Sequence, residues 1–117
     1  MPYVDGFVLP LHPDKHDAYK ALAETFAREA RKLGGISVES LGDGLEQGKI
    51  TSFPRSVQAQ EGENVVFSFV IWPDKATRDA GMKSVMDDPR MKDIPAMPFD
   101  GKRMIFGGFE TVVNVAK

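Results

Sequence analysis

The chain has 117 residues, 42% hydrophobic and 27% charged, which suits one globular domain with its own apolar core. It contains no cysteine, and this excludes disulfides, thiol nucleophiles and cysteine-based metal sites. The formal net charge is −2, with basic residues interleaved among acidic ones, which argues against nucleic-acid binding because phosphate recognition usually needs a basic surface.

A membrane partner is not expected either. The longest apolar run lies around Val65 to Trp72 and is far too short to cross a bilayer. The N-terminal residues show no basic segment ahead of an apolar one, as a signal peptide would. The sequence therefore predicts a cytoplasmic protein.

The first strand is predicted over Tyr3 to Leu11, where both alternating sets of side chains are largely apolar. Such a strand is typical of a sheet centre that is covered on both faces. A helix should follow from Pro13, because proline fits a first helical turn, and should end at Gly34 and Gly35. Its apolar positions recur at spacings of three and four: Tyr19, Leu22, Phe26, Ala30 and Leu33.

The middle of the chain predicts further strands. Ile36 to Leu41 reads as a second strand, and Ile50 to Gln60 as a weaker one that Pro54 would place at a sheet edge. A hairpin turn is expected at Glu61 to Asn64. Val65 to Trp72 is the strongest strand signal, and its continuous apolar character predicts burial on both faces.

The last third of the sequence predicts a second helix and a closing strand. The helix begins after Asp74 as N-cap and ends at Asp87-Asp88-Pro89. Pro89 to Met97 has room for one more helical turn, and Arg103 to Val115 is the final strand. The order β-α-β-β-β-α-β matches a ferredoxin-like split βαβ sandwich (an α+β fold) with an extra strand segment, in a single domain over residues 1–117.

Two helices on one face of a single sheet would leave the other face uncovered. The predicted strands are nevertheless apolar on both faces. A second copy of the chain would cover the free face, and the sequence therefore predicts a homodimer in which two sheets close into a barrel-like core.

Several blocks of the sequence resemble the YbaA-like bacterial family, a family of unknown function. They are Tyr3 to Val8, Val65 to Phe69, Asp88 to Met91 and Met97 to Ile105. The resemblance covers almost the whole chain and implies a dimeric α/β barrel. That superfamily includes cofactor-independent monooxygenases, lactone isomerases and haem-degrading enzymes. This sequence departs from the family pattern after Glu39, where the family tends to have a tryptophan and two acids.

The resemblance implies a barrel that binds a small, partly apolar molecule without a cofactor, with oxygenase-like or isomerase-like chemistry. The alternative is a non-catalytic dimeric module with a structural or regulatory role. A pocket between sheet and helices, lined by Asp5, Ser68, Trp72 and Arg103, would favour the first interpretation over the second.

Asp5 is the first candidate for chemistry, because an ionised carboxylate inside an apolar strand is costly unless it is paired. The first and last strands are antiparallel neighbours in the expected topology, which would bring Asp5 beside Arg103 and Lys102. The pair would be either a polar anchor for an anionic ligand or a structural ion pair, and the structural interpretation is favoured.

Ser68 is the second candidate, as a lone hydroxyl on a buried strand that would orient a ligand, with Trp72 and Glu110 near the strand ends. No histidine stands at a spacing that would activate Ser68 as a nucleophile, so a hydrolase triad is poorly supported. Trp72 would line a pocket mouth or, more commonly for tryptophan, pack in the core or an interface.

The remaining polar clusters favour structural roles. His12 and His16 have a metal-like spacing, but His12 precedes the helix and no third ligand is evident, so no metal site is expected. Arg90 is expected to dock onto Asp100 and hold the connection before the last strand. The glycines at Gly6 and Gly107-Gly108 indicate close backbone approach, either for a ligand or for tight sheet geometry.

Overall fold

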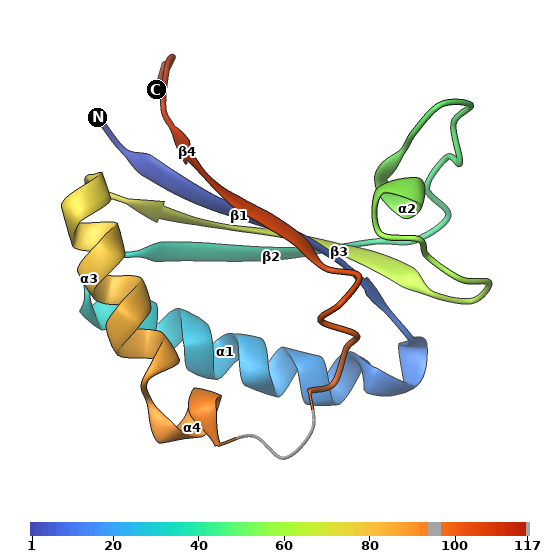
Figure 1. The fold of residues 1–117 in the computed structure, drawn as a ribbon, viewed down its shortest axis with the longest axis horizontal. Helices are drawn as coiled ribbons and strands as arrows, with labels where there is room; N and C mark the ends of the chain where they lie inside the picture. The colour runs from blue at the N-terminus through green and yellow to red at the C-terminus, as the bar shows by residue number, and fades with distance from the viewer. Residues whose placement is uncertain (94–96, 117) are drawn as a thin grey trace.

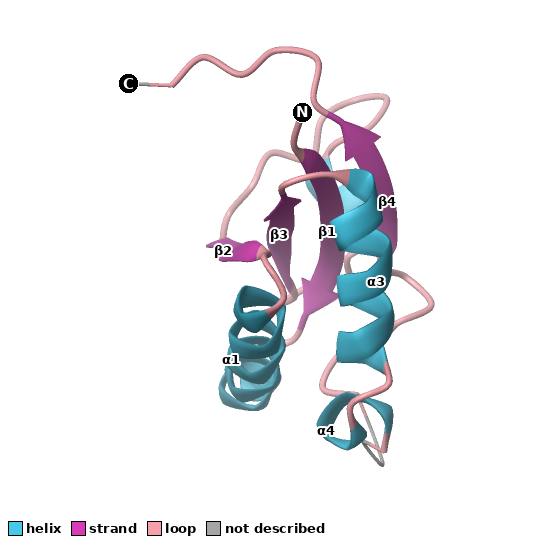
Figure 2. Cartoon of the chain, turned by 90° about the vertical axis from the view of Figure 1, so that its left-hand side faces the viewer, coloured by secondary structure: helices cyan, strands magenta, loops and turns pink. Residues whose placement is uncertain are grey.

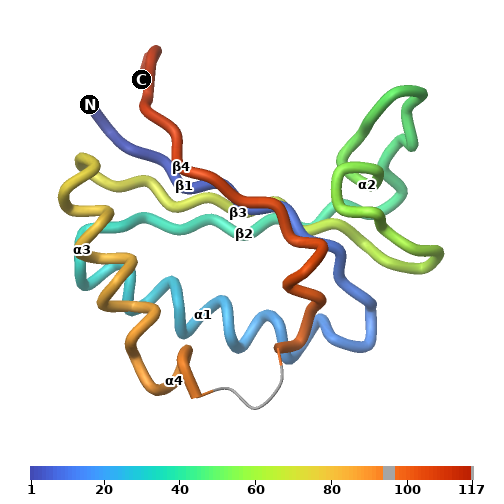
Figure 3. The backbone as a smooth tube through the Cα atoms, in the orientation of Figure 1, coloured from blue at the N-terminus to red at the C-terminus, as the bar shows by residue number. Residues whose placement is uncertain are grey.

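One sheet of four antiparallel strands, in the order β2-β3-β1-β4, organises the structure (Figure 1). The strands are β1 (Tyr3–Leu11), β2 (Ile36–Gly42), β3 (Asn64–Trp72) and β4 (Ile105–Glu110). The computed structural model describes residues 1–93 and 97–116. β1 and β4 are antiparallel neighbours, as predicted, so the start of β1 and the end of β4 lie side by side (Figure 3).

Two longer helices, α1 (His16–Lys32) and α3 (Lys75–Met86), pack on one face of this sheet. Figure 2 shows both helices on the same side of the strands. The short helices η1 (Pro13–Lys15), α2 (Phe53–Ser56) and α4 (Pro89–Lys92) lie in the connections. The α+β fold and its ferredoxin-like arrangement, predicted from the sequence, are confirmed. None of the described helices is both long enough and apolar enough to cross a membrane.

The helix boundaries follow from local chemistry. Asp74 caps α3 as predicted, and its carboxylate accepts a hydrogen bond from the Thr77 amide at 2.7 Å. Gly34 follows α1 with a φ of 104°, a left-handed conformation that favours glycine and ends the helix. The further turn expected after Pro89 is α4.

The strand predicted over Ile50 to Gln60 is wrong, and with it the extra strand segment. This stretch contains α2 instead, because the Ser52 hydroxyl accepts a hydrogen bond from the Arg55 amide at 3.1 Å and Pro54 occupies the first helical turn. The turn at Glu61 to Asn64 therefore does not join two strands of a hairpin, as predicted, but lies in the connection from α2 to β3. The Ser52 cap and Pro54 in the first turn favour a helix here, and this local preference is stronger than the preference for a strand indicated by the alternating apolar residues.

The last strand is shorter than predicted and ends at Glu110 in place of Val115. Glu110 pairs with Tyr3, which is the first residue of β1, and the Thr111 amide bonds to the Pro2 carbonyl at 3.2 Å. Because β1 begins at Tyr3, residues 112–115 have no backbone of β1 beside them with which to form strand hydrogen bonds.

The core lies between the sheet and the helices. Trp72 is completely buried and packs with Ala30, Val70 and Val85. A second cluster of Leu9, Leu11 and Val66 lies toward the other end of the sheet. The alternating side chains of each strand therefore divide into a helix-facing set and a set on the open face.

Gly81 on α3 makes room for the Trp72 ring. A Cβ at this position would lie 2.5 Å from the ring, far inside van der Waals contact. We expect Gly81→Ala to lower the free energy of unfolding by up to about 2 kcal/mol, since overpacking costs about 1–3 kcal/mol and alanine returns about 1 kcal/mol of helix propensity. Urea denaturation measures this. Gly101→Ala is the matched control, because a Cβ there meets nothing within 4 Å, and a stabilised Gly81→Ala protein would contradict the packing.

Candidate functional site

Three polar side chains meet between α1 and the sheet. Tyr19 lies on α1, Glu39 on β2 and Ser68 on β3, where Ser68 is directly opposite Glu39 in the strand pairing. The Tyr19 hydroxyl donates a hydrogen bond to Glu39 Oε1 at 2.5 Å. Ser68 is only 4% exposed, whereas Glu39 lies at the protein surface with one side toward the helix.

An apolar pocket of about 130 Å³ opens beside these three residues. Its other lining residues are mostly aliphatic, aromatic or methionine side chains: Phe7, Leu9, Leu22, Ala23, Phe26, Met86, Met91, Met97, Phe99 and Met104. A wider groove of about 440 Å³ lies on the outer side, between α1 and β2, and shares Tyr19, Ala23 and Glu39 with the pocket. The Tyr19–Glu39 pair therefore stands between the pocket and the outer groove.

The surroundings of the pair change its acid–base chemistry. Partial removal of water from around the carboxylate raises the pKa of Glu39, and hydrogen bonds from Tyr19 and Ser68 partly offset that rise. Burial beside α1, together with the hydrogen bond to Glu39, raises the pKa of Tyr19 well above its usual range. The site thus pairs a carboxyl that takes up a proton more readily than usual with a phenol that stays protonated, an arrangement suited to proton transfer.

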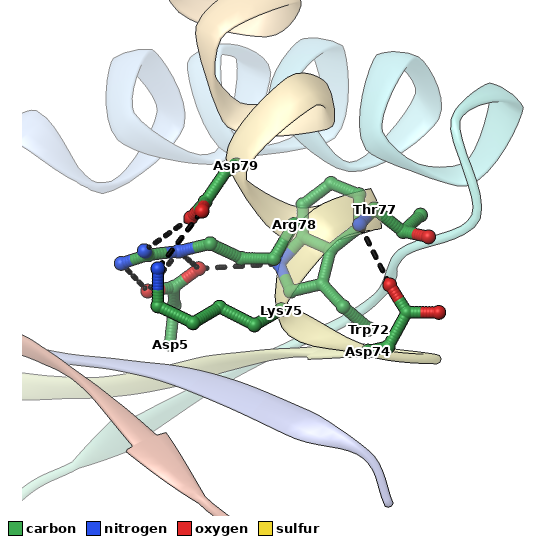
Figure 4. Close-up of polar contacts among 7 residues, drawn as sticks. All are labelled: Asp5, Trp72, Asp74, Lys75, Thr77, Arg78 and Asp79. Atoms are coloured by element: carbon green, nitrogen blue, oxygen red, sulfur yellow. Dashed lines mark hydrogen bonds and ion pairs between the residues drawn. The ribbon is translucent and has the colours of Figure 1, made fainter.

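Asp5 is buried as predicted, but its ion-pair partner is Arg78 of α3 and not Arg103 (Figure 4). Arg78 Nη2 lies 2.7 Å from Asp5 Oδ1, and the indole nitrogen of Trp72 donates to Asp5 Oδ2 at 3.1 Å. The hydrogen bonds that Arg78 donates to Asp5, and then to Asp79, raise the pKa of the Arg78 guanidinium. The guanidinium also lies over the Tyr3 ring, 5.0 Å from its centroid. The cluster joins α3 to the first and third strands.

Arg103 lies in a different ion-pair cluster, at the opposite end of β1. Its guanidinium binds Glu63 at 2.7 Å and Asp100 at 3.0 Å, and donates to the Gln58 carbonyl. The hydrogen bonds from Arg103 lower the pKa of Glu63. The predicted Asp5–Arg103 pair is wrong because Arg103 precedes β4 and lies beyond the residues that pair with β1.

The other predicted site residues are dispersed. Trp72 is fully buried in the core and does not line a pocket mouth. Glu110 pairs with Tyr3 at the end of β4, and Lys102 lies exposed in the turn before that strand. Of the four residues expected to line one pocket, only Ser68 is found in the pocket beside α1.

The structure also shows the contacts of Arg90 and of the two histidines. Arg90 binds Asp88 and Glu29, so its predicted contact with Asp100 is wrong. His12 accepts a hydrogen bond from the Asp14 amide, whereas His16 contacts Asn64. Among the described residues, no three His, Asp or Glu side chains are grouped as metal ligands would be.

The sequence reading missed Tyr19 and Glu39 as site residues. In the sequence, Tyr19 falls on the apolar face of the first predicted helix, and Glu39 falls within the strand predicted over Ile36 to Leu41. A glutamate opposite a serine on a neighbouring strand, with a tyrosine on the covering helix, is a signal only when strand register is known. More than twenty residues separate β2 from β3, and a connection of this length does not fix the pairing register of the two strands. The local sequence pattern therefore could not show that Glu39 lies opposite Ser68.

Comparisons with known proteins agree with this fold. The chain is 46% identical over 116 residues to the uncharacterised protein YbaA of Escherichia coli (strain K12), covering 97% of this chain and 99% of that protein. The same identity and coverage hold for YbaA of Shigella flexneri. The structure of Rv0793 from Mycobacterium tuberculosis aligns with a TM-score of 0.54 at 14% identity, over 99% of this chain and 100% of that one.

A de novo designed protein, Foldit4, aligns equally well, with a TM-score of 0.54 at 10% identity over 95% of this chain and 99% of that one. These two structural likenesses show the fold alone. The sequence comparisons go further, because a family model described as "Protein of unknown function (DUF1428)" matches residues 2–101. With that match and the near full-length identity to YbaA, the chain belongs to the DUF1428 family.

Proposed function

We propose that this protein binds a small, partly apolar molecule in the pocket beside α1 and that Glu39 moves a proton on it, in an isomerase-like reaction. The observation that carries the proposal is the Tyr19–Glu39 pair at the wall of an apolar pocket of about 130 Å³. A carboxyl of raised pKa is a good general base near neutral pH, and the Tyr19 hydroxyl, which donates to Glu39 Oε1, holds that carboxyl in position at the pocket wall.

Oxygenase-like chemistry is the related possibility from the family resemblance, and it shares the first step. In both reactions a base removes a proton from an activated carbon or hydroxyl. The isomerase-like form is favoured because it also needs that proton to be returned, which one carboxyl can do. The alternative, a non-catalytic dimeric module, predicts no pocket of ligand size. The pocket beside α1 has a largely apolar lining with polar groups on one wall, which is typical of a small-molecule site and favours the binding proposal.

Solvent hydrogen exchange tests the proton transfer without knowledge of the natural reaction. Small neutral molecules that raise the melting temperature of the protein are incubated with it in D₂O, and NMR follows deuterium entry at carbon. We expect Glu39→Gln to slow this exchange by about 10²–10⁴-fold, the usual contribution of a general base. The rate should rise with pH as Glu39 loses its proton, with a midpoint above the ordinary value of 4.5 for a glutamate.

Glu46→Gln is the matched control, because Glu46 is exposed in the loop after β2 and lies outside the pocket. Its exchange rate should equal that of the wild type. Molecules that bind in the pocket but exchange no faster than in free solution would contradict catalysis and favour the non-catalytic module. A complete absence of binders would contradict the use of the pocket.

We also propose that the working unit is a homodimer in which the open sheet faces of two copies pack together. On this face lies a row of exposed apolar side chains that includes Ile36 (64% exposed), Ile105 (45%) and Phe109 (61%). Phe67 (45%) lies beside them and is partly covered by the Phe53 ring of α2, with the two ring centroids 5.9 Å apart. Gly6 and Gly107 are paired across β1 and β4, and the Phe109 ring lies over both of them. A contiguous apolar and aromatic surface of this kind is typical of a protein interface.

A further inference from the structure

The chemistry of the pocket lining narrows the class of ligand, on the premise that the proposed small-molecule site is correct. Size is the first constraint. An apolar cavity of roughly 150 Å³ in a protein takes up benzene. The pocket beside α1, at about 130 Å³, therefore suits one six-membered ring and not a fused ring system.

The lining is unusually rich in methionine. The protein has six methionines, and four of them line this pocket: Met86, Met91, Met97 and Met104. A thioether sulfur makes favourable contacts with aromatic rings, and a flexible methionine adapts to the ring that enters. The Tyr19 and Phe99 rings already meet edge to face in this wall, with centroids 5.7 Å apart. These side chains favour a flat aromatic ring over a saturated one.

Charge is the third constraint. None of the described lining residues is Lys, Arg or His, and the only ionisable groups are the Tyr19 hydroxyl and the Glu39 carboxyl. An anionic ligand such as a carboxylate would find no counter-charge there and would face Glu39. A neutral hydroxyl, in contrast, can donate to a Glu39 carboxylate oxygen or to the Ser68 hydroxyl oxygen, since these two residues are opposite each other on adjacent strands.

We propose that the ligand of this pocket is a neutral phenol with a single ring, which lies among the methionines and directs its hydroxyl to Ser68 and Glu39. The apolar lining then contacts the ring carbons and the polar wall contacts the oxygen. The same carboxyl that accepts the hydroxyl hydrogen is the base of the proposed proton transfer, so binding and chemistry involve one group.

The methionine methyl groups are the reporters for the test. The full-length protein is labelled with ¹³C-methyl methionine and titrated separately with phenol, cyclohexanol and benzoate. Phenol should shift the methyl signals of the four pocket methionines through its ring current, while Met1 and Met82, which lie outside the pocket, stay in place. Cyclohexanol should bind at least tenfold more weakly and benzoate should give no saturable shift.

Ser68→Ala separates the polar wall from the apolar lining. It should weaken phenol about tenfold and leave toluene unchanged, because only phenol has a hydroxyl to lose its partner. Binding of cyclohexanol or benzoate as tight as that of phenol would overturn the phenol class but leave small-molecule binding intact. Equal shifts at all six methionines would also overturn it. If none of these molecules moves any pocket methyl, and no molecule in the thermal screen does so, the proposed site itself fails.

Discussion

Replacing Arg78 with methionine should lower the free energy of unfolding by about 3–5 kcal/mol, which is the usual cost of leaving a buried charge without its partner. The Asp5 side chain is only 4% exposed and that of Arg78 25%. The guanidinium makes three hydrogen bonds to the Asp5 carboxylate, of 2.7 to 3.1 Å. Without it, Asp5 keeps only the indole N–H of Trp72 as a side-chain partner among the described contacts.

Chemical denaturation of the purified protein measures this loss, and two further variants locate its cause. Arg90→Met removes an arginine of the same kind that is 58% exposed, and should leave stability nearly unchanged. The double variant Asp5→Asn with Arg78→Met removes both charges and should recover about 2 kcal/mol. A double variant no more stable than Arg78→Met alone would show that lost packing of the arginine stem, and not the unpaired charge, causes the effect.

Replacing Phe109 with aspartate should convert the proposed homodimer to a monomer. Phe109 is 61% exposed in the single chain, on the open sheet face. In a two-fold interface each substitution occurs twice, and loss of a central aromatic contact costs about 2 kcal/mol per copy. A total of about 4 kcal/mol weakens association roughly 10³-fold.

Analytical ultracentrifugation over a range of protein concentrations reads this out directly. Ile50→Asp is the matched control, since Ile50 is 95% exposed in the loop between β2 and α2 and lies away from the sheet face. It should remain a dimer. A wild-type chain that sediments as a stable monomer at all concentrations would contradict the proposed dimer, and a dimeric Phe109→Asp protein would place the interface elsewhere.

The fold was largely predictable because its signals are local. The apolar run of β3 and the three-and-four spacing on α1 each predict an element without reference to the rest of the chain. The Asp74 cap and the glycine after α1 fix helix ends by the same local hydrogen bonds that the structure shows. The error at Ile50 to Gln60 arose where two local signals conflict, since apolar alternation competes with a serine–proline helix start.

The candidate site was predicted poorly because its residues come from distant parts of the chain. The sequence predicts Ser68 as a site residue on a buried strand, but Tyr19 is 49 positions before it and is brought to the same pocket by the packing of α1. For Asp5 the sequence predicts a cationic partner but assigns that role to Arg103 with Lys102, which is wrong. The partner proved to be on α3, 73 positions away.

Apart from the stretch that contains α2, the sequence by itself determined the kinds of element and their order, and also the family resemblance and the need to pair the charge on Asp5. Each of these follows from periodicity, capping or the cost of burying charge, and those are properties of short segments. Only the tertiary structure decided that Arg78 pairs with Asp5, that Arg103 pairs with Glu63, and that Tyr19, Glu39 and Ser68 share one pocket. Strand register and the packing of helices on the sheet determine these contacts, and both depend on the whole core at once.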